Sequence, residues 1–461
     1  MLNYIWLGLV LCAVLIGGWN GQLKEVTKQC LDMANFAVVG IAFALIGVMA
    51  LWLGVMRLAE RAGLVALLAR AMRPLMCRIF PEVPADHPAM GSMLMNIAAN
   101  MLGLGNAATP LGLRAMKDLE TLNPRPGTAT NAMCTFLAIN TSGIQLIPVT
   151  AIAILAANKS TNPTAIVGTS IICGICACIS GVLMAKFLCK LPMFRLAAPE
   201  PGSSRGNEAQ IKNQNVPTSV ATGEAEKVVI KEAATLSPMK WWGNVIIVGF
   251  LLFFFLLFLR LVLPESFGLP LPPDDAGQNL FVRLLVRIVS AISLLSIPFL
   301  LSLFPLYAAL RRVKVYEEFV DGAKEGFEVA IRIIPYLVAM LVAVAMFRAA
   351  GGIDLISHLL SPALNAIGFP TDLLPMAVVR PLSGSGSLGF FTELVKNFGP
   401  DSLISRTAGT IYGSTETTFY VLAVYFGSVA IKRTRHAVLA GLTADAVSVI
   451  VAVIVCKIVF S

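Results

Sequence analysis

Apolar residues in this chain form long continuous runs rather than short alternating segments. The clearest run is Trp241–Leu263, WWGNVIIVGFLLFFFLLFLRLVL. A membrane-spanning helix needs about 20 such residues, whereas strands of a membrane barrel alternate apolar and polar positions. The pattern therefore predicts an all-α polytopic membrane protein. The expected spans are about Ile5–Trp19, Ala34–Met56, Ala129–Ala157, Ile166–Leu188, Trp241–Leu263, Leu280–Leu310, Ile331–Phe347, Thr407–Val429 and Ala437–Phe460.

Composition agrees with this prediction. Of the 461 residues 57% are hydrophobic and 13% charged, against about 25% charged in soluble domains. The net charge of +9 comes from short basic clusters beside apolar runs, a pattern that sets membrane orientation. We therefore expect no nucleic-acid partner. The cysteines of GTSIICGICACIS lie inside an apolar run, and the three histidines are far apart, so neither a metal nor a cofactor is expected.

One long segment has a different composition. Residues 196–238 are polar and rich in Pro, Gly and Ser, and such a segment cannot bury enough apolar surface to fold alone. We expect a cytoplasmic disordered linker there. It would separate two membrane halves, residues 1–195 and 239–461.

The two halves repeat each other in sequence. ANFAVVGIAFALIGVMALWLGVMRLAERAGL resembles EVAIRIIPYLVAMLVAVAMFRAAGGIDL, NMLGLGNAATPLG resembles RPLSGSGSLGFF, and FLAINTSGIQLIPVTAIAI resembles TIYGSTETTFYVLAVYFGS. These matches set Arg57 opposite Arg348 and Thr141 opposite Thr415. Three matches in the same order indicate an internal duplication.

Basic residues indicate that the two copies are inverted. Arg57–Arg78 is rich in arginine, and its counterpart, Arg348–Pro370, is not. Conversely, KRTRH is basic, whereas its counterpart NKSTNP holds one lysine. Because short cytoplasmic loops collect Lys and Arg, equivalent loops are expected on opposite sides of the membrane. The amino terminus and linker would be inside and the carboxyl terminus outside.

Inverted repeats with Gly-interrupted apolar segments are typical of secondary transporters. The topology predicts two re-entrant hairpins, Ala89–Glu120 and Leu374–Phe398. Non-helical backbone at membrane depth occurs only where protein covers it or water lines it. Such hairpins suit a binding site, although small residues there also serve close helix packing.

Polar residues in the two hairpins and in the clusters that follow them are the candidate solute ligands. They are Asn96, Asn100, Gly103, Gly105, Asn106, Asn140, Thr141, Ser142, Gln145, Arg380, Ser383, Ser385, Ser414, Thr415 and Glu416. Arg380 would pair with a substrate anion or with an internal acid. Glu416 and Asp445 are intramembrane acids and therefore candidates for ion coupling. The hydroxyl groups could instead satisfy neighbouring backbone.

No motif of enzyme chemistry is present. The chain has no HExxH, no GxSxG and no paired catalytic constellation, although each would mark a known mechanism. We expect no catalytic residues and no enzyme activity.

Several long motifs resemble one known family. NIAANMLGLGNAATPLGLRAMKDLETLNP and ATNAMCTFLAINTSGIQLIPVT resemble spore maturation protein A, and RPLSGSGSLG and FGPDSLISRTAGTIYGSTETTFYVLAVYFGSVAIKRTRHAVLAGLTAD resemble spore maturation protein B. The resemblance covers nearly all of the chain outside the linker, as in a natural fusion. Both belong to the nucleoside recognition, or gate, domain group. That group is similar to parts of concentrative nucleoside transporters, whose re-entrant hairpins and following helices build the substrate site.

These observations predict a permease for a small polar solute, with nucleoside-like solutes among the candidates. The protein would be a multi-pass protein of the bacterial inner membrane. Its expected partners are membrane lipid and that solute, and the sequence leaves association into a homo-oligomer open. The alternative is a non-transporting membrane scaffold or regulator of envelope or spore maturation. Solute-dependent stabilisation would separate the two.

Overall fold

The computed structural model describes residues 2–194, 239–267, 280–352, 355 and 368–460. Within these residues the regular elements are helices, and β-pairing is limited to an isolated bridge between Thr128 and Arg433. The helices are α1 (Leu2–Trp19), α2 (Leu23–Asn35), α3 (Phe43–Arg61), α4 (Leu64–Ile79), α5 (Pro88–Met101), α6 (Gly105–Glu120), α7 (Asn131–Thr141), α8 (Val149–Ala157), α9 (Ile166–Leu188), α12 (Trp241–Val262), α13 (Leu280–Leu310), α14 (Val315–Ala349), α16 (Leu374–Val379), α17 (Gly384–Phe398), α18 (Leu403–Ser414), α19 (Thr418–Gly427) and α20 (Ala437–Phe460). A π-helical turn (Phe36–Ala42) joins α2 to α3, and 3-10 turns lie at Pro192–Phe194, Pro264–Phe267 and Thr371–Leu373. The predicted linker, 196–238, lies outside the described residues, so its disorder and the domain limits stay predictions.

Two of the expected spans are interrupted helices. The run 129–157 forms α7 and α8, and the run 407–429 forms α18 and α19. In the first, Gly143 has a left-handed φ of 47° and Pro148 precedes α8; proline offers no amide to continue a helix. In the second, Thr415 is extended, with φ −140° and ψ 159°. The polar clusters thus mark breaks, not continuous helix.

Helices α3 and α14 cross with their backbones in contact. A Cβ added to Gly322 of α14 would lie 2.6 Å from the carbonyl oxygen of Leu53, and one added to Gly326 would lie 2.6 Å from that of Met49. Small residues one turn apart allow this approach in membrane helices. The α3–α14 crossing therefore forms a tight scaffold that joins the two halves of the chain.

Helix α14 also holds the second hairpin through an ion pair. Arg348, near the end of α14, pairs with Glu393 of α17, whose side chain is 2% exposed. Asn397 donates to the same carboxylate. A buried pair of this kind fixes the position of α17 because separating the partners would leave an uncompensated charge.

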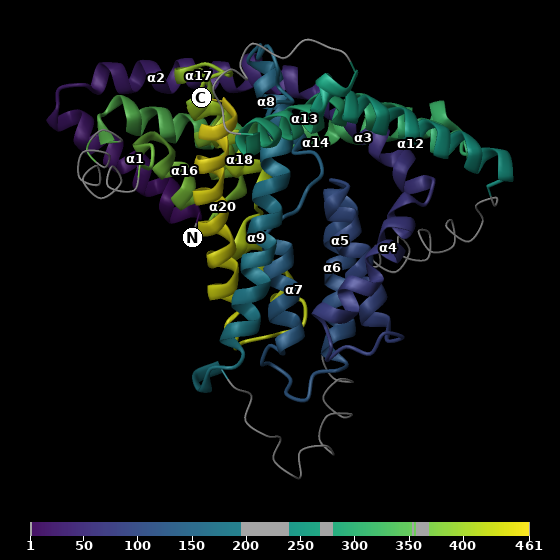
Figure 1. Ribbon diagram of the computed structural model, residues 1–461. Helices are drawn as coiled ribbons and strands as arrows, with labels where there is room; N and C mark the ends of the chain where they lie inside the picture. The colour runs from purple at the N-terminus through teal and green to yellow at the C-terminus, as the bar shows by residue number, and fades with distance from the viewer. Residues whose placement is uncertain (1, 195–238, 268–279, 353–354, 356–367, 461) are drawn as a thin grey trace.

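Helices α9 and α20 pack side by side and run in opposite directions. Near the end of α9, the carbonyl oxygen of Phe194 accepts from Arg435, which immediately precedes α20. At the other end, Thr169 of α9 and Cys456 of α20 both contact Thr410. Figure 1 shows the pair running down the molecule beside α7, α5 and α6.

Two loop contacts tie the halves together at opposite ends of α9. Asp401, between α17 and α18, accepts from the Ser160 hydroxyl at 2.6 Å and from the Thr161 amide at 2.9 Å, just before α9 begins. Beyond the other end of α9, the amides of Lys432 and Arg433 donate to the carbonyl of Gly127 at 2.9 and 3.0 Å. Each loop that follows a hairpin is therefore held by the other half.

Among the described residues, four helices are long and apolar enough to cross a membrane: Ile166–Leu188, Trp241–Val262, Val282–Leu310 and Ala437–Phe460. The apolar window of α12 is 6% buried, against 50% in α9 and α20, so α12 presents nearly its whole surface to its surroundings. In Figure 1, α12 and α13 run across the end of the molecule from which α9 and α20 descend. The two pairs therefore meet a flat bilayer at different tilts.

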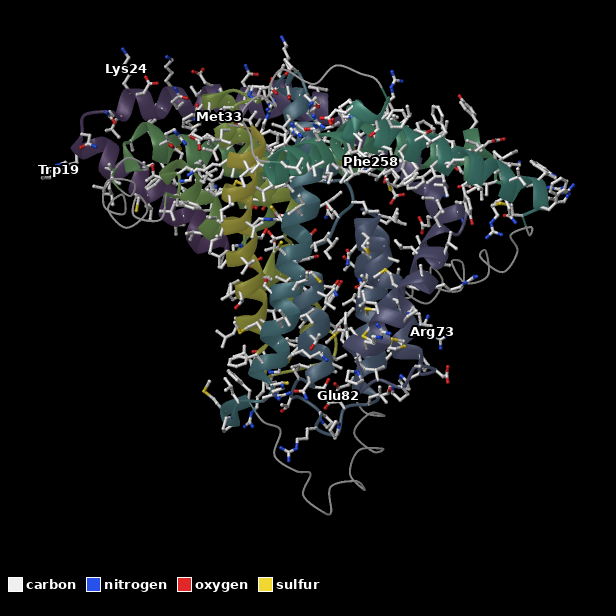
Figure 2. All side chains as sticks on the ribbon, viewed as in Figure 1. Trp19, Lys24, Met33, Arg73, Glu82 and Phe258 are labelled. Carbon is white, nitrogen blue, oxygen red and sulfur yellow. The ribbon has the colours of Figure 1, made fainter. Side chains whose placement is uncertain are left out.

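Charged and aromatic side chains mark the margins of the molecule. Figure 2 shows Lys24 of α2 and Trp19 of α1 at one margin, with Arg73 of α4 and Glu82 toward the opposite end, while Phe258 lies on α12. Trp19 is 93% exposed. Aromatic and basic side chains at helix ends are typical of residues that lie where lipid meets water.

Candidate functional site

Two helix breaks, one between α7 and α8 and one between α18 and α19, meet in the centre of the molecule with the turns of the two hairpins. The amide of Glu416, in the break between α18 and α19, donates to the carbonyl of Thr141 at the end of α7, at 2.8 Å. Each break also bonds the turn of its own hairpin: Leu146 donates to the Met101 carbonyl at 2.9 Å, and Phe419 donates to the Pro381 carbonyl at 3.0 Å. Backbone groups freed by the breaks are thus satisfied by one another, as buried backbone requires.

A cavity of about 130 Å³ lies at this meeting point. Its lining comes from the two breaks, the start of α8, the end of α18 and the turn of the second hairpin. The lining residues are Gln145, Pro148, Thr150, Ala151, Arg380, Gly384, Tyr412, Gly413, Glu416 and Thr417. Three of them, Gln145, Arg380 and Glu416, are among the ligands that the sequence predicted.

Arg380 is the cationic residue of the cavity wall. It is 4% exposed, and its Nη2 donates to the carbonyls of Tyr412, at 2.9 Å, and of Thr415. Its guanidinium lies 4.5 Å from the centre of the Tyr412 ring, a cation–π distance. Arg380 thus sits on the carboxyl end of α18, where the helix dipole favours a cation. Among the described residues no carboxylate pairs with it, so the internal ion pair considered from the sequence is not formed.

Glu416 and Gln145 line the same cavity. Gln145 donates its side-chain amide to Oε1 of Glu416 at 2.9 Å, and both side chains are half-buried. Only one carboxylate oxygen is engaged by this bond, and an ionised carboxylate has acceptor sites to spare. Glu416 therefore offers a charged acceptor to whatever enters the cavity.

The amino end of α17 faces the same cavity. Ser383 caps the helix, accepting from the amide of Gly386 at 2.9 Å, and Ser385 lies 3.4 Å from its hydroxyl. Gly384, the first helical residue, lines the cavity. Ser383 therefore acts on the helix, and the glycine after it leaves the helix end open toward the cavity.

The predicted asparagines of the first half come together in a network of their own. Asn100 donates to Oδ1 of Asn140 at 2.9 Å, Tyr425 donates to the same oxygen at 3.3 Å, and Asn96 donates to the Tyr425 hydroxyl at 3.2 Å. The Tyr425 ring stacks on Phe136, with centroids 6.1 Å apart. None of these residues lines the cavity. They instead seal the α5–α6 hairpin against α7 and α19.

The remaining predicted ligands act mainly on backbone or on each other. Ser142 donates to Ile139 in its own helix at 2.7 Å, and the Ser414 hydroxyl lies 2.7 Å from that of Ser448 on α20. Gly103 forms the turn of the first hairpin, with φ 75°. Gly105 begins α6, and Asn106 follows it within the helix; the side chain of Asn106 lies outside what the structure describes. The roles of all these residues toward a solute stay predictions.

Asp445 lies behind the second break, on α20. It is 4% exposed, and one of its carboxylate oxygens accepts from the Thr418 hydroxyl. The other oxygen, Oδ1, is buried without a hydrogen-bond partner. An unpartnered buried carboxylate oxygen carries a desolvation cost, and it is the kind of group that holds a proton or a cation.

Sequence reasoning missed several residues of this centre. Tyr412 lines the cavity; it lies two residues before Ser414, where the predicted polar cluster begins, so a wider window would have included it. The same polar cluster contains Thr417, which also lines the cavity. Tyr425 lies in the apolar run VLAVYFGS, and nothing in that pattern separates it from a residue facing lipid. Among the residues that the structure describes, no group of three His, Cys, Asp or Glu side chains is arranged to hold a metal ion.

Comparison with known proteins agrees with this architecture. A family model described as Gate, nucleoside recognition, matches residues 42–158 and again residues 330–432. Each matched region contains a hairpin and the broken helix after it. The same model therefore describes both copies of the internal duplication. No solved structure matches the chain.

Two curated relatives match almost over their full lengths. Spore maturation protein B of Bacillus subtilis (strain 168) is 46% identical over 175 residues, which cover 38% of this chain and 98% of the relative. Spore maturation protein A of the same organism is 42% identical over 187 residues, which cover 41% of this chain and 95% of the relative. Inner membrane protein YjiG of Escherichia coli (strain K12) is 25% identical over 115 residues, covering 25% of this chain and 67% of that protein. This chain is therefore a multi-pass membrane protein that belongs to the nucleoside recognition (Gate) family, within the group of spore maturation proteins A and B.

Proposed function

We propose that the protein is a permease of a bacterial inner membrane that moves a small polar solute through the central cavity, and that it is not an enzyme. The observation that carries the proposal is a polar cavity where two helix breaks meet the turn of the second hairpin, lined by Gln145, Arg380 and Glu416 among others. Broken helices that meet at the interface of two repeats are the usual construction of a secondary-transporter site. In this proposal each hairpin is re-entrant: it enters the membrane and leaves it again on the same face, and the two hairpins enter from opposite faces.

An inverted relation between the halves is part of the proposal. The antiparallel course of α9 and α20 supports it, as do the reciprocal loop contacts at the two ends of α9. The basic KRTRH loop is at one end and the loop carrying Asp401 is at the other. Since basic loops remain in the cytoplasm, we assign the end with KRTRH to the inside.

The size of the cavity limits the solute. Its 130 Å³ is well below the roughly 300–1,000 Å³ of pockets that enclose drug-sized ligands. At about 30 Å³ per molecule in the liquid, it corresponds to about four waters. A nucleoside would require the hairpins to move apart, whereas a smaller solute would not. The family description alone is therefore a weak guide to the substrate.

Coupling to an ion is proposed at Asp445. This carboxylate lies behind the break that carries Glu416 and contacts α19 through Thr418. Binding of a proton or a cation at its unpartnered oxygen would change the charge beside that break. The two intramembrane acids then have separate roles, with Glu416 facing the solute and Asp445 responding to the ion.

A two-stage experiment tests the permease. Purified protein is screened by thermal unfolding against nucleosides, amino acids and organic ions, and the compounds that stabilise it are then followed into proteoliposomes. Arg380→Gln and Glu416→Gln should abolish uptake while the protein still inserts. Arg406→Gln is the matched control, because Arg406 lies on α18 outside the cavity and pairs with Asp401. Normal uptake in both cavity variants would refute the proposed site.

A membrane scaffold is the second candidate function. It is supported by the names of the two relatives, which refer to spore maturation and to no solute. A scaffold would purify with stable partner proteins, and no compound in the screen would stabilise it. Co-purification without stabilisation would favour the scaffold over the permease.

A further inference from the structure

We propose that the central cavity binds a small zwitterion, of the class of the smallest α-amino acids. The inference rests on the proposed permease site and names its solute. It follows from two walls of opposite charge, one containing Arg380 and the other Glu416.

The first wall is built to receive a carboxylate. Nη2 of Arg380 is held by the carbonyls of Tyr412 and Thr415, while its buried Nε has no hydrogen-bond partner. Its Nη1 faces α17: a Cβ added to Gly384 would lie 3.9 Å from it. Among the described residues Nη1 also has no partner. The guanidinium is 4% exposed and retains unused donors. An anion would satisfy these donors and compensate the buried charge.

The amino end of α17 adds to the same wall. Ser383 caps the amide of Gly386, and its carbonyl accepts from Ser387. Within the described chain, the amides of Gly384 and Ser385 are left without a partner. Free amides and the positive end of a 15-residue helix form an anion site. Gly384 has no side chain that would separate them from the cavity.

The second wall disfavours a simple anion. Glu416 lines the same 130 Å³, and only its Oε1 is engaged, by Gln145. An anion confined with this carboxylate would be repelled. A solute that also carries an ammonium group converts the repulsion into an ion pair. Opposite charges at the two ends of one small solute therefore satisfy both walls, and the volume of about four waters admits few further atoms.

The experiment compares the two ends of the zwitterion separately. Glycine, L-alanine, acetate, methylammonium and uridine are titrated into purified wild-type protein, and binding is measured by calorimetry and by the shift in thermal unfolding. Glycine and L-alanine should bind, and acetate and methylammonium should bind at least about tenfold more weakly, because each lacks one charge-assisted bond. Equal affinity for glycine and acetate would overturn the inference, as would binding of uridine alone.

Variants test each wall. Arg380→Gln should weaken glycine binding about tenfold or more, whereas Arg406→Gln should leave it unchanged. Glu416→Gln should remove the repulsion, so that acetate binds as well as glycine. This gain of acetate binding requires a folded protein and therefore cannot arise from misfolding. An unchanged preference for glycine in Glu416→Gln would refute the second wall.

Failure of this inference can be told from failure of the permease. Glycine binding without uptake into proteoliposomes would support the zwitterion site and refute transport. Uptake of uridine but not of glycine would support transport and refute the zwitterion.

Discussion

The two hairpins occupy corresponding positions but are built from different chemistry. At the α5–α6 hairpin, asparagine amides and the Tyr425 hydroxyl bond one another, and none of these residues lines the central cavity. At the α16–α17 hairpin, Arg380 lines a cavity that Glu416 also lines. Helix α9 has no acidic residue in its 23 positions, whereas its neighbour α20 carries Asp445. Arg380 and Glu416 of the cavity and the neighbouring Asp445 thus all lie in the second half.

This difference shows how a duplicated fold can specialise. Duplication supplies two sets of breaks that meet and satisfy each other's backbone. Neutral amides then make one side a rigid support, because a fully satisfied polar network specifies a single arrangement. On the other side, Arg380 and Glu416 can bind a solute, because they have donors and acceptors that no protein group uses. Substitutions in the first hairpin should therefore mainly change stability, and substitutions around the second should mainly change solute binding or transport.

The largest effect is expected at Asp445. Asp445→Asn removes the ionisable group of α20 but keeps a side chain of similar shape that can still contact Thr418. Solute binding in detergent should be retained, while uptake driven by an imposed proton or sodium gradient should fall to that of protein-free liposomes. Counterflow exchange under equal ion concentrations separates a coupling defect from a loss of the site.

Asp321→Asn is a suitable control for this variant. Asp321 is an acid on α14 that hydrogen-bonds Lys324 at 3.0 Å near the surface. Gradient-driven uptake should be unaffected in the Asp321→Asn variant. If Asp445→Asn protein still responds to both gradients, the coupling role at α20 is wrong.

The next effect concerns stability at one glycine in each hairpin. A Cβ added to Gly112 of α6 would lie 2.2 Å from the Tyr425 hydroxyl oxygen and 2.9 Å from Nδ2 of Asn96. Because the stacked ring cannot move aside freely, Gly112→Ala should lower the free energy of unfolding by about 1–3 kcal/mol. Solute affinity should change little. Denaturant unfolding in mixed micelles measures the first quantity and calorimetry the second.

Gly384→Ala should show the opposite pattern. There the added Cβ would lie 3.0 Å from the Thr417 hydroxyl, which can rotate, and 3.9 Å from Nη1 of Arg380. Stability should fall by less than about 1 kcal/mol, while solute binding weakens because a methyl group occupies the cavity. Equal stability losses in the two variants would mean that both hairpins are packed alike.

Much of this architecture could be predicted from the sequence. Continuous apolar runs predict the helical membrane class. Glycine and polar clusters predict where helices are interrupted, and the repeat pairs one break with the other. The sequence could not indicate which polar groups satisfy each other, because that depends on how each helix is rotated. Asn100 and Gln145 both carry a side-chain amide, yet Asn100 donates to Asn140 and Gln145 donates to Glu416. Tyr425 gave no signal because an apolar run does not tell its buried face from its outer face.

A smaller effect is expected at the hydroxyl that closes the first hairpin. Tyr425→Phe keeps the ring stacked on Phe136 but removes the bonds to Asn96 and Asn140. Hydrogen bonds between membrane helices average about 0.6 kcal/mol, so the free energy of unfolding should fall by about that amount. Binding and uptake should be unchanged. A clear loss of binding in this variant would place a solute on the first hairpin too and end the contrast between the sides.

The smallest effect concerns the loop that follows each hairpin, and it depends on pH. Burial alone would raise the pKa of Asp401, but hydrogen bonds from Ser160 and Thr161, with the Arg406 guanidinium, lower it from 3.8 to about 2. A lowered pKa means that the contact stabilises the folded state fully above pH 4 and is lost as pH falls toward 2. The loop after the first hairpin is held to the other half by hydrogen bonds from the amides of Lys432 and Arg433 to the carbonyl of Gly127, and these backbone groups do not titrate.

Amide hydrogen exchange can compare the two loops directly. The protection factor of the Thr161 amide, which donates to Asp401, should decline between pH 4 and pH 2, while that of the Arg433 amide stays constant. In Asp401→Asn protein the Thr161 amide should be weakly protected at every pH in this window, with a global stability loss below about 1 kcal/mol because the pair is partly exposed. If both amides lost protection together, the two ends would open as one unit, and the two hairpins would not be independent of each other.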